Sequence, residues 1–239
     1  MDGSMTVTQL WRYPVKSMAG EALDQTEVSD LGIDGDRQWG LVDTDTGLVL
    51  TARRVPDLLL ASPVASGDTV AIRLPDGTIT DDDATLSAWL GRSVALRRPE
   101  PDERGFYEIA EDDDDPSSDW IQWHGPKGVW HDSTRTRLSI VDESAMGHWD
   151  VRRFRPNVVV SGGDERTLVD TDVAIGSVRL RVMKEIDRCV IVTRPQPGLD
   201  RDRSVLTSVH RDRSGNLGVG AVVRRPGRIA IGDTIEVLR

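Results

Sequence analysis

The sequence contains one cysteine, Cys189, among 239 residues. A single thiol cannot form an internal disulfide or a four-cysteine zinc site, and an iron–sulfur cluster needs several cysteines. If Cys189 is functional, it therefore acts as one thiolate, and the neighbouring Arg188 would stabilise that charged form. The alternative is a buried thiol that packs as a small apolar residue on a strand, because Val190, Ile191 and Val192 follow directly.

Long apolar runs and excess positive charge are also missing. No apolar run approaches the roughly 18–20 residues of a membrane span, and the N-terminus lacks the basic-then-apolar pattern of a signal peptide. Lys and Arg number 30 against 40 Asp and Glu, which gives a formal net charge of −10. This balance argues against a nucleic-acid groove or an anionic membrane surface as the main partner. We expect a cytoplasmic protein, since one unpaired thiol suits a reducing compartment.

The apolar residues that are present come in short runs separated by turn formers such as Pro75-Asp76-Gly77. This pattern predicts a mostly β protein with one or two small barrels and few short helices, rather than alternating βαβ units. One helix is predicted over residues 83–90, with Gly91 past its end, and a second over 142–149, which Gly147 weakens. The runs interpreted as strands are 39–42, 58–60, 70–74, 138–141, 157–160, 178–182, 190–192, 229–231 and 235–238.

Residues 97–127 interrupt this rhythm with four prolines, little periodicity and five consecutive acids, Glu111 to Asp115. Adjacent like charges repel and favour a solvated loop. A calcium site is the alternative, but the alternating acid spacing of a helix–loop–helix calcium loop is absent. We predict an N-terminal β-barrel-like domain over 1–96, an acidic irregular junction over 97–127 and a C-terminal barrel over 128–239. Trp120, Trp123 and Trp130 could line a pocket there, or pack in a core.

Several different polar motifs occur along the chain, each once. They are Trp11-Arg12-Tyr13-Pro14-Val15-Lys16-Ser17, Gly35-Asp36-Arg37, Thr51-Ala52-Arg53, His131-Asp132-Ser133-Thr134, Phe154-Arg155-Pro156-Asn157 and Asp187-Arg188-Cys189. Together they resemble the MOSC family, the C-terminal domain of molybdenum-cofactor sulfurases with its N-terminal β-barrel partner. Within that family the likeness is to amidoxime-reducing components and their bacterial relatives. The resemblance covers nearly the whole chain.

The resemblance implies a molybdenum cofactor, either molybdopterin or its dinucleotide form, with Cys189 as the metal ligand and catalytic residue. A soft thiolate suits molybdenum. The cofactor-binding residues that it implies are Lys16, Ser17, Arg37, Ser133, Thr134, Arg155, Asn157 and Arg188. Their chemistry agrees, because arginine forks bind phosphate and an asparagine offers a heterocycle edge both a donor and an acceptor. Each also has a structural alternative: an exposed lysine, an Arg37–Asp36 ion pair or a strand entry at Pro156. His131 is interpreted as structural.

The implied reaction is the reduction of an N–O bond in a small N-hydroxylated compound. Because no glycine-rich dinucleotide fingerprint and no cluster of cysteines is present, the electrons are expected from a separate ferredoxin- or flavin-type reductase. The alternative is a non-redox module that binds the cofactor or carries sulfur as a Cys189 persulfide. A zinc or hydrolytic enzyme finds little support, because the four histidines lie in no familiar ligand spacing. The run 194–198 departs from the family's acidic turn, which leaves substrate specificity and the electron-donor contact open.

Overall fold

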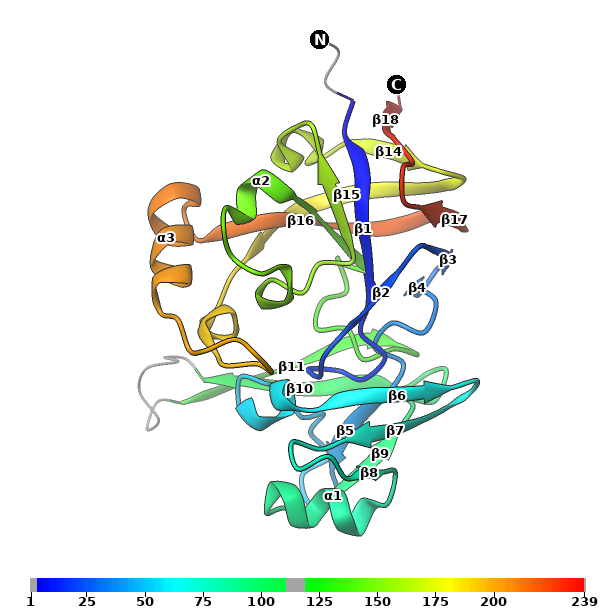
Figure 1. The fold of residues 1–239 in the computed structure, drawn as a ribbon. Coiled ribbons are helices and arrows are strands. Elements are labelled where there is room, and N and C mark those ends of the chain that lie inside the picture. The colour runs from blue at the N-terminus through cyan, green and yellow to red at the C-terminus, as the bar shows by residue number, and fades with distance from the viewer. Residues whose placement is uncertain (1–3, 111–118, 239) are drawn as a thin grey trace.

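The computed structural model describes residues 4–110 and 119–238, and these are mostly β-strands (Figure 1). The strands are β1 (Thr6–Arg12), β2 (Glu21–Leu23), β3 (Gln25–Ser29), β4 (Gly32–Ile33), β5 (Gly40–Asp43), β6 (Ser62–Ser66), β7 (Thr69–Arg73), β8 (Ile79–Thr80), β9 (Val94–Arg97), β10 (Arg104–Ala110), β11 (Trp120–Lys127), β12 (Leu138–Asp142), β13 (Val158–Ser161), β14 (Asp172–Ile175), β15 (Val178–Asp187), β16 (Asn216–Arg225), β17 (Gly227–Ala230) and β18 (Ile235–Leu238). The α-helices are α1 (Asp83–Leu90), α2 (Glu143–Met146) and α3 (Ser204–Arg213), and the 3₁₀ helices are η1 (Pro56–Leu60), η2 (Val151–Arg153), η3 (Glu165–Leu168) and η4 (Val190–Thr193).

An eight-stranded sheet forms the larger part, in the order β18-β14-β15-β16-β12-β13-β1-β2. Its neighbouring strands are antiparallel except β12 and β13, which run parallel. The sheet curls in Figure 1 around one apolar core. The N-terminal strand β1 pairs with β13, with Leu10 opposite Val158, and β17 pairs with β3. Residues from both ends of the chain are therefore joined in the same sheets, while the domain boundaries remain a prediction.

The central strands β12 and β13 are apolar at successive positions because both of their faces are covered. Ile140 and Val158 point into the core of the curled sheet, whereas Val141 and Val159 pack with residues of α2 and α3 on the other side. Side chains alternate along a strand, so burial on both faces requires an unbroken apolar run. The helices therefore cover the outer face of the sheet next to the loop that carries Cys189.

A second, smaller core lies among β5, β7, β9 and α1, at the bottom of Figure 1. Helix α1 begins where Asp82 accepts a hydrogen bond from the Thr85 amide (2.8 Å), and it ends at Gly91 with φ +64°. A carboxylate cap satisfies an otherwise unpaired amide, and glycine adopts the left-handed conformation without strain. The helix predicted over 83–90 is confirmed.

Other local predictions were wrong in instructive ways. The runs 58–60 and 190–192 are parts of the 3₁₀ helices η1 and η4 instead of strands. Three apolar residues have no readable period, and Pro56 favours a helical start. The second predicted helix is only Glu143–Met146, because Gly147 ends it, and helix α3 was not predicted.

The stretch predicted as an irregular junction contains a hairpin. Strands β10 and β11 pair antiparallel, with Tyr107 opposite Trp123, and Val49 donates a backbone bond to Phe106 (2.8 Å). Tyr107 and Trp130 lie in a small buried cluster, so Trp130 is a core residue. The five acids at 111–115 lie outside the described residues. Among the helices of the described residues, none has the length and apolarity to span a bilayer.

Candidate functional site

A cavity of about 250 Å³ is lined by residues from both halves of the chain, from the stretches 16–53 and 131–192. Eight of the described residues that line it are cationic: Lys16, Arg37, Arg53, Arg137, Arg153, Arg155, Lys184 and Arg188. Only two carboxylates, Asp132 and Asp187, line the same cavity. In a chain of net charge −10, this concentration of positive charge indicates a site for an anion.

Cys189 lies two residues after the end of β15 and immediately before η4, and its side chain lines the cavity. The thiol is only partly buried. Its Sγ accepts a hydrogen bond from Arg53 Nε at 3.2 Å, across 136 residues of sequence. The alternative of an apolar thiol on a strand does not agree with this position, because the sulfur borders a polar cavity and has a cationic partner.

Three of the predicted site residues have a left-handed backbone: Ser17 (φ +68°), Arg37 (φ +52°) and Arg155 (φ +52°). For residues other than glycine this conformation costs roughly 1–2 kcal/mol each. Local hydrogen bonds hold it, since Arg37 N donates to Tyr13 O (2.7 Å) and Arg155 N to Val151 O (3.2 Å). All three residues line the cavity, so the strain is concentrated where side chains must be aimed at a ligand.

Tyr13 contacts two of these arginines. The guanidinium carbons of Arg155 and Arg37 are 4.3 Å and 4.9 Å from the centre of its ring, and its hydroxyl donates to Pro156 O (3.1 Å). Burial raises the pKa of Tyr13, so the phenol stays neutral. The ring therefore supports both cations through cation–π contacts without neutralising their charge.

Arg155 is a partly buried cation with its donors unused. Within residues 4–110 and 119–238 its guanidinium makes no hydrogen bond and no ion pair, and its contact is the Tyr13 ring. Burial lowers the pKa of Arg155 to about 10, which still leaves the side chain charged at neutral pH. Guanidinium groups removed from water bind carboxylate or phosphate strongly, so Arg155 has the properties of an anion-binding residue.

Arg188 lines the same cavity but uses its donors differently. Its Nε donates to Leu217 O (2.7 Å) and its Nη1 to Phe154 O (2.8 Å), and burial lowers its pKa to about 10. The residue before Cys189 therefore ties the loop to β16 and to the turn at Phe154. The hydrogen bond to the sulfur comes from Arg53 instead, a residue of the quoted Thr-Ala-Arg motif to which the sequence assigned no role.

Asn157 is 2% exposed, and its amide is already bonded inside the protein. Its Nδ2 donates to Asp36 Oδ2 (3.1 Å), and its Oδ1 accepts from the Ser139 amide (3.2 Å). Asp36 in turn forms an ion pair with Arg37. Asn157 thus orients the carboxylate that holds Arg37, a role for which the sequence carried no signal beyond the motif itself.

Lys16 enters the cavity wall as a buried ammonium, 4% exposed. Its Nζ donates to Asp132 Oδ1 (2.6 Å) and to Trp130 O (2.9 Å). Burial lowers the pKa of Lys16, and Asp132 opposes that shift. The Asp132 side chain is 60% exposed. Partial loss of water around its carboxylate acts to raise the pKa, but the charge and hydrogen bond of Lys16 and the charge of Arg53 outweigh it and lower the pKa. Lys16 and Asp132 therefore form an ion pair in the cavity wall.

The loop after Trp130 contributes unevenly. Ser133 lines the cavity, whereas Thr134 is exposed and does not. Thr136 and Arg137 line the cavity instead of Thr134. His131 also lines it, is 5% exposed, and its Nε2 has no hydrogen-bond partner within the described residues. Burial, and then the charges of nearby cations, lower the pKa of His131 well below 6.5, so the imidazole is neutral.

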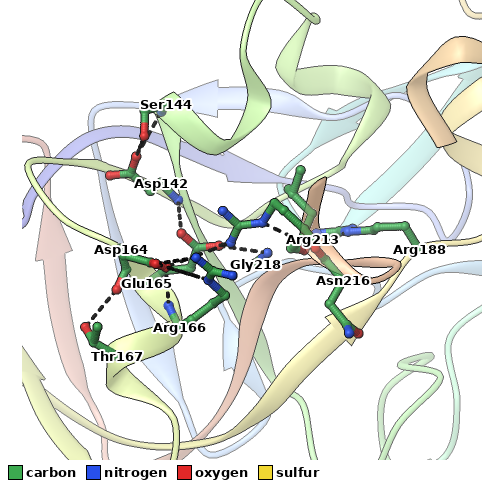
Figure 2. A network of polar contacts seen from close by, with 11 residues as sticks. Asp142, Ser144, Asp164, Glu165, Arg166, Thr167, Arg188, Arg213, Asn216 and Gly218 are labelled. Atoms are coloured by element: carbon green, nitrogen blue, oxygen red, sulfur yellow. Dashed lines mark hydrogen bonds and ion pairs between the residues drawn. The ribbon is translucent and has the colours of Figure 1, made fainter. Parts of the chain in front are cut away.

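A polar network around Glu165 extends toward Arg188, the residue before Cys189 (Figure 2). Glu165 is fully buried and accepts hydrogen bonds from Arg213, from the Gly218 amide (3.1 Å) and from the Asp142 amide (3.3 Å). Gly218 follows Leu217, whose carbonyl accepts from Arg188. The carboxylate therefore fixes the segment of β16 that anchors the residue before Cys189.

Comparison with known proteins yields two domain matches. A MOSC N-terminal beta barrel domain matches residues 4–94, and a MOSC domain matches residues 131–236. Together the two matches cover most of the chain and include every cavity-lining residue. The segment between them contains the β10–β11 hairpin.

The chain is also similar to individual proteins. It is 27% identical to the molybdenum cofactor sulfurase of Drosophila grimshawi over 97% of this chain, but it spans about one third (34%) of that relative's length. It is 25% identical to human mitochondrial amidoxime-reducing component 1, over 98% of this chain and 83% of that protein. Among solved structures, the YUAD protein from Bacillus subtilis aligns over 98% of this chain and 95% of its own, with 16% identity and a TM-score of 0.46.

Proposed function

Because the chain belongs to the MOSC family, we propose that it is a molybdenum-cofactor-dependent oxidoreductase that reduces small N-hydroxylated compounds. The observation that carries the proposal is the meeting of the only thiol with eight cations and two carboxylates around one cavity. A thiolate is a suitable ligand for molybdenum beside dithiolene sulfurs, and clustered guanidiniums suit a phosphorylated pterin.

The residues present fit such a group. Arg155 has a guanidinium without a protein hydrogen bond among the described residues, and His131 has a buried ring nitrogen without a partner there. Unmet hydrogen-bonding capacity around a cavity favours a polar ligand, because a buried unpaired polar group costs about 1–3 kcal/mol. Arg155, Arg37 and Lys16 would hold the anionic part, and Cys189 the metal.

When bound, the cofactor supplies a two-electron metal centre for cleaving the N–O bond. The overall change is that an N-hydroxylated substrate takes up two electrons and two protons and yields the amine or amidine and water. Electrons would come from a separate redox protein of the ferredoxin or flavin type. On the protein side, Lys16 holds a proton at Nζ against Asp132, whose side chain is 60% exposed and so reaches water. Arg53 holds the sulfur of Cys189 at the cavity wall.

The first experiment is metal analysis of protein produced with molybdate in a host that makes the cofactor. We expect about one molybdenum per chain and reduction of a benzamidoxime with an artificial electron donor. Cys189→Ser should abolish turnover. A fully active Cys189→Ser variant would show that the sulfur is not the metal ligand and would end the proposal.

A second experiment tests Arg155, whose guanidinium contacts the Tyr13 ring but makes no hydrogen bond within the described residues. Arg155→Met removes no hydrogen bond between described side chains, so its unfolding free energy should stay within about 1 kcal/mol of the wild type, while retained molybdenum falls at least tenfold. Arg152→Met is the matched control, because Arg152 pairs with Asp150 and bonds Pro197 O outside the cavity lining. Equal metal retention in the two variants would argue against an anion site at Arg155.

A non-redox role in sulfur or cofactor transfer is the second candidate, and the similarity to a molybdenum cofactor sulfurase over nearly the whole chain favours it. In that case a persulfide on Cys189 would be the functional species. It predicts sulfur that cyanide releases from the wild type and that Cys189→Ser lacks, with no reductase activity from any electron donor. Cyanide-releasable sulfur together with turnover would leave the reductase as the better description.

A further inference from the structure

The hydrogen bond between Arg53 and Cys189 joins the N-terminal part of the cavity wall to the Cys189 sulfur. We propose that Arg53 is a positioning residue for Cys189, which holds the sulfur at the cavity wall and stabilises negative charge on it. The inference deepens the proposed function, since it takes Cys189 as the reacting sulfur in either the redox or the sulfur-transfer role.

The turn that carries Arg53 is held firmly. Val55 N donates to Thr51 O (2.8 Å), and Ala52 N donates to the Ser17 hydroxyl (3.0 Å). Ala52 is 1% exposed, so the residue before Arg53 is buried in the fold. A side chain on a fixed turn loses less conformational entropy on binding its partner than one on a free loop. Ser17 therefore supports the cavity by anchoring this turn, with its own strained backbone as part of the anchor.

The sulfur is reached by Arg53 and not by the adjacent arginine. Arg53 Nε lies 3.2 Å from Sγ, whereas Arg188 directs its donors to Leu217 O and Phe154 O. Arg188 contributes positive charge from further away. The direct donor to the sulfur therefore comes from the other half of the chain, and the site is complete only when the two halves are packed together.

A guanidinium donor beside a thiolate has a specific chemical effect. Donors to a ligand sulfur withdraw charge from it, and a nearby cation stabilises whichever state of the site is more negative. For a metal bound to this sulfur, the more negative state is the reduced one. Loss of Arg53 should therefore make reduction of the metal harder without removing the ligand itself.

A matched control is present on the same turn. Arg54 follows Arg53, but it forms an ion pair with Glu108 and lies over the Trp120 ring at 4.2 Å, and it does not line the cavity. Arg54→Met removes the same charge and the same side-chain volume as Arg53→Met. Comparing the two variants separates an effect at the sulfur from an effect of net charge or of the turn.

The decisive measurement needs no cofactor. In cofactor-free protein, Cys189 is alkylated at one fixed pH with neutral iodoacetamide and with anionic iodoacetate, and the ratio of the two rates is taken. Access to the sulfur and its thiolate fraction affect both reagents alike, so the ratio reports the charge beside the sulfur. Removing one cation about 4 Å away should lower the iodoacetate-to-iodoacetamide ratio about fivefold in Arg53→Met. Arg54→Met should leave the ratio within twofold of the wild type, and Arg53→Lys should restore most of it.

The same variants are then loaded with cofactor. We expect Arg53→Met to keep its molybdenum but to show a more negative midpoint potential and an altered Mo(V) paramagnetic resonance spectrum, while Arg54→Met matches the wild type. Circular dichroism and melting curves check that both variants fold. An alkylation ratio in Arg53→Met within twofold of the wild type, or an equal drop in Arg54→Met, overturns the inference. Absence of molybdenum from the wild type would instead refute the redox function and leave the alkylation result standing.

Discussion

Replacing Glu165 by glutamine tests the polar network around this buried carboxylate (Figure 2). All three partners of this carboxylate are donors: the Arg213 guanidinium and the amides of Gly218 and Asp142. Glutamine has one acceptor oxygen, and its NH₂ group would face a donor. The change therefore leaves at least one buried N–H without an acceptor and leaves Arg213 without its nearest counter-charge.

The size of the loss follows from these contacts. Breaking a buried ion pair from one side costs about 3–5 kcal/mol. Arg213 is 14% exposed and has Asp164 at 4.0 Å as a second partner, so we expect the lower end, about 3 kcal/mol. For a chain of this length each kcal/mol lowers the melting temperature by about 2–4 °C, which gives a drop of roughly 6–12 °C.

The assay is urea and thermal unfolding of Glu165→Gln, Arg213→Met and the double variant. Because the two side chains share one interaction, the double variant should lose less than the sum of the single losses, with a coupling of at least about 1 kcal/mol. A loss below about 1 kcal/mol in Glu165→Gln, or strictly additive losses, would refute the assignment of a stabilising buried pair.

Three further outcomes follow from local geometry. Gly218 has φ +83°, and a Cβ there would lie 2.5 Å from the Val141 side chain, so Gly218→Ala should lower the free energy of unfolding by about 3 kcal/mol or more. Gly47 has φ +74° but open space around it, so Gly47→Ala should cost about 1 kcal/mol. Similar losses for the two variants in urea unfolding would contradict this. Burial and then surrounding positive charge hold the pKa of His131 below 6.5, so the unfolded chain binds the proton at higher pH than the folded one. The free energy of unfolding should thus fall as pH drops below 6.5, by up to about 1.4 kcal/mol per pH unit until the folded imidazole is protonated. If the difference in unfolding free energy between the wild type and His131→Gln stays constant from pH 7.5 to 5, this prediction is wrong. Asp82→Ala removes the cap of α1 and should lower the free energy of unfolding by about 1 kcal/mol, while the molybdenum content is unchanged. A loss of metal in this variant would contradict the separation of the two cores.

The sequence predicted the parts of the fold whose signals are local. Helix α1 has its cap, its glycine end and its apolar face within ten residues, and a mostly β class follows from many short apolar runs divided by turn formers. Runs of three residues failed at 58–60 and 190–192, because so short a run has no period. The β10–β11 hairpin was missed because prolines and the acidic run around it indicated a loop.

For the candidate site, the motifs identified Lys16, Ser17, Arg37, Arg155 and Cys189 as residues to be brought together, and all of them line one cavity. The details of their contacts could not be predicted. Nothing in the motif indicates that the Asn157 amide bonds inward to Asp36, or that the Ser17 hydroxyl accepts from Ala52. Those partners come from segments distant in sequence, and their approach depends on the packing of both cores.

By itself, the sequence determined that this protein has one thiol, an acidic surface overall and a small set of ordered cationic motifs. Only the tertiary structure decided which cation meets the sulfur. Arg188 is adjacent to Cys189 in the chain, yet the curl of β15 against β16 turns its donors to the Leu217 carbonyl, and a firmly held turn brings Arg53 to Sγ instead. Adjacency in sequence sets charge and composition, whereas side-chain direction is set by the strands and turns that long-range packing brings together.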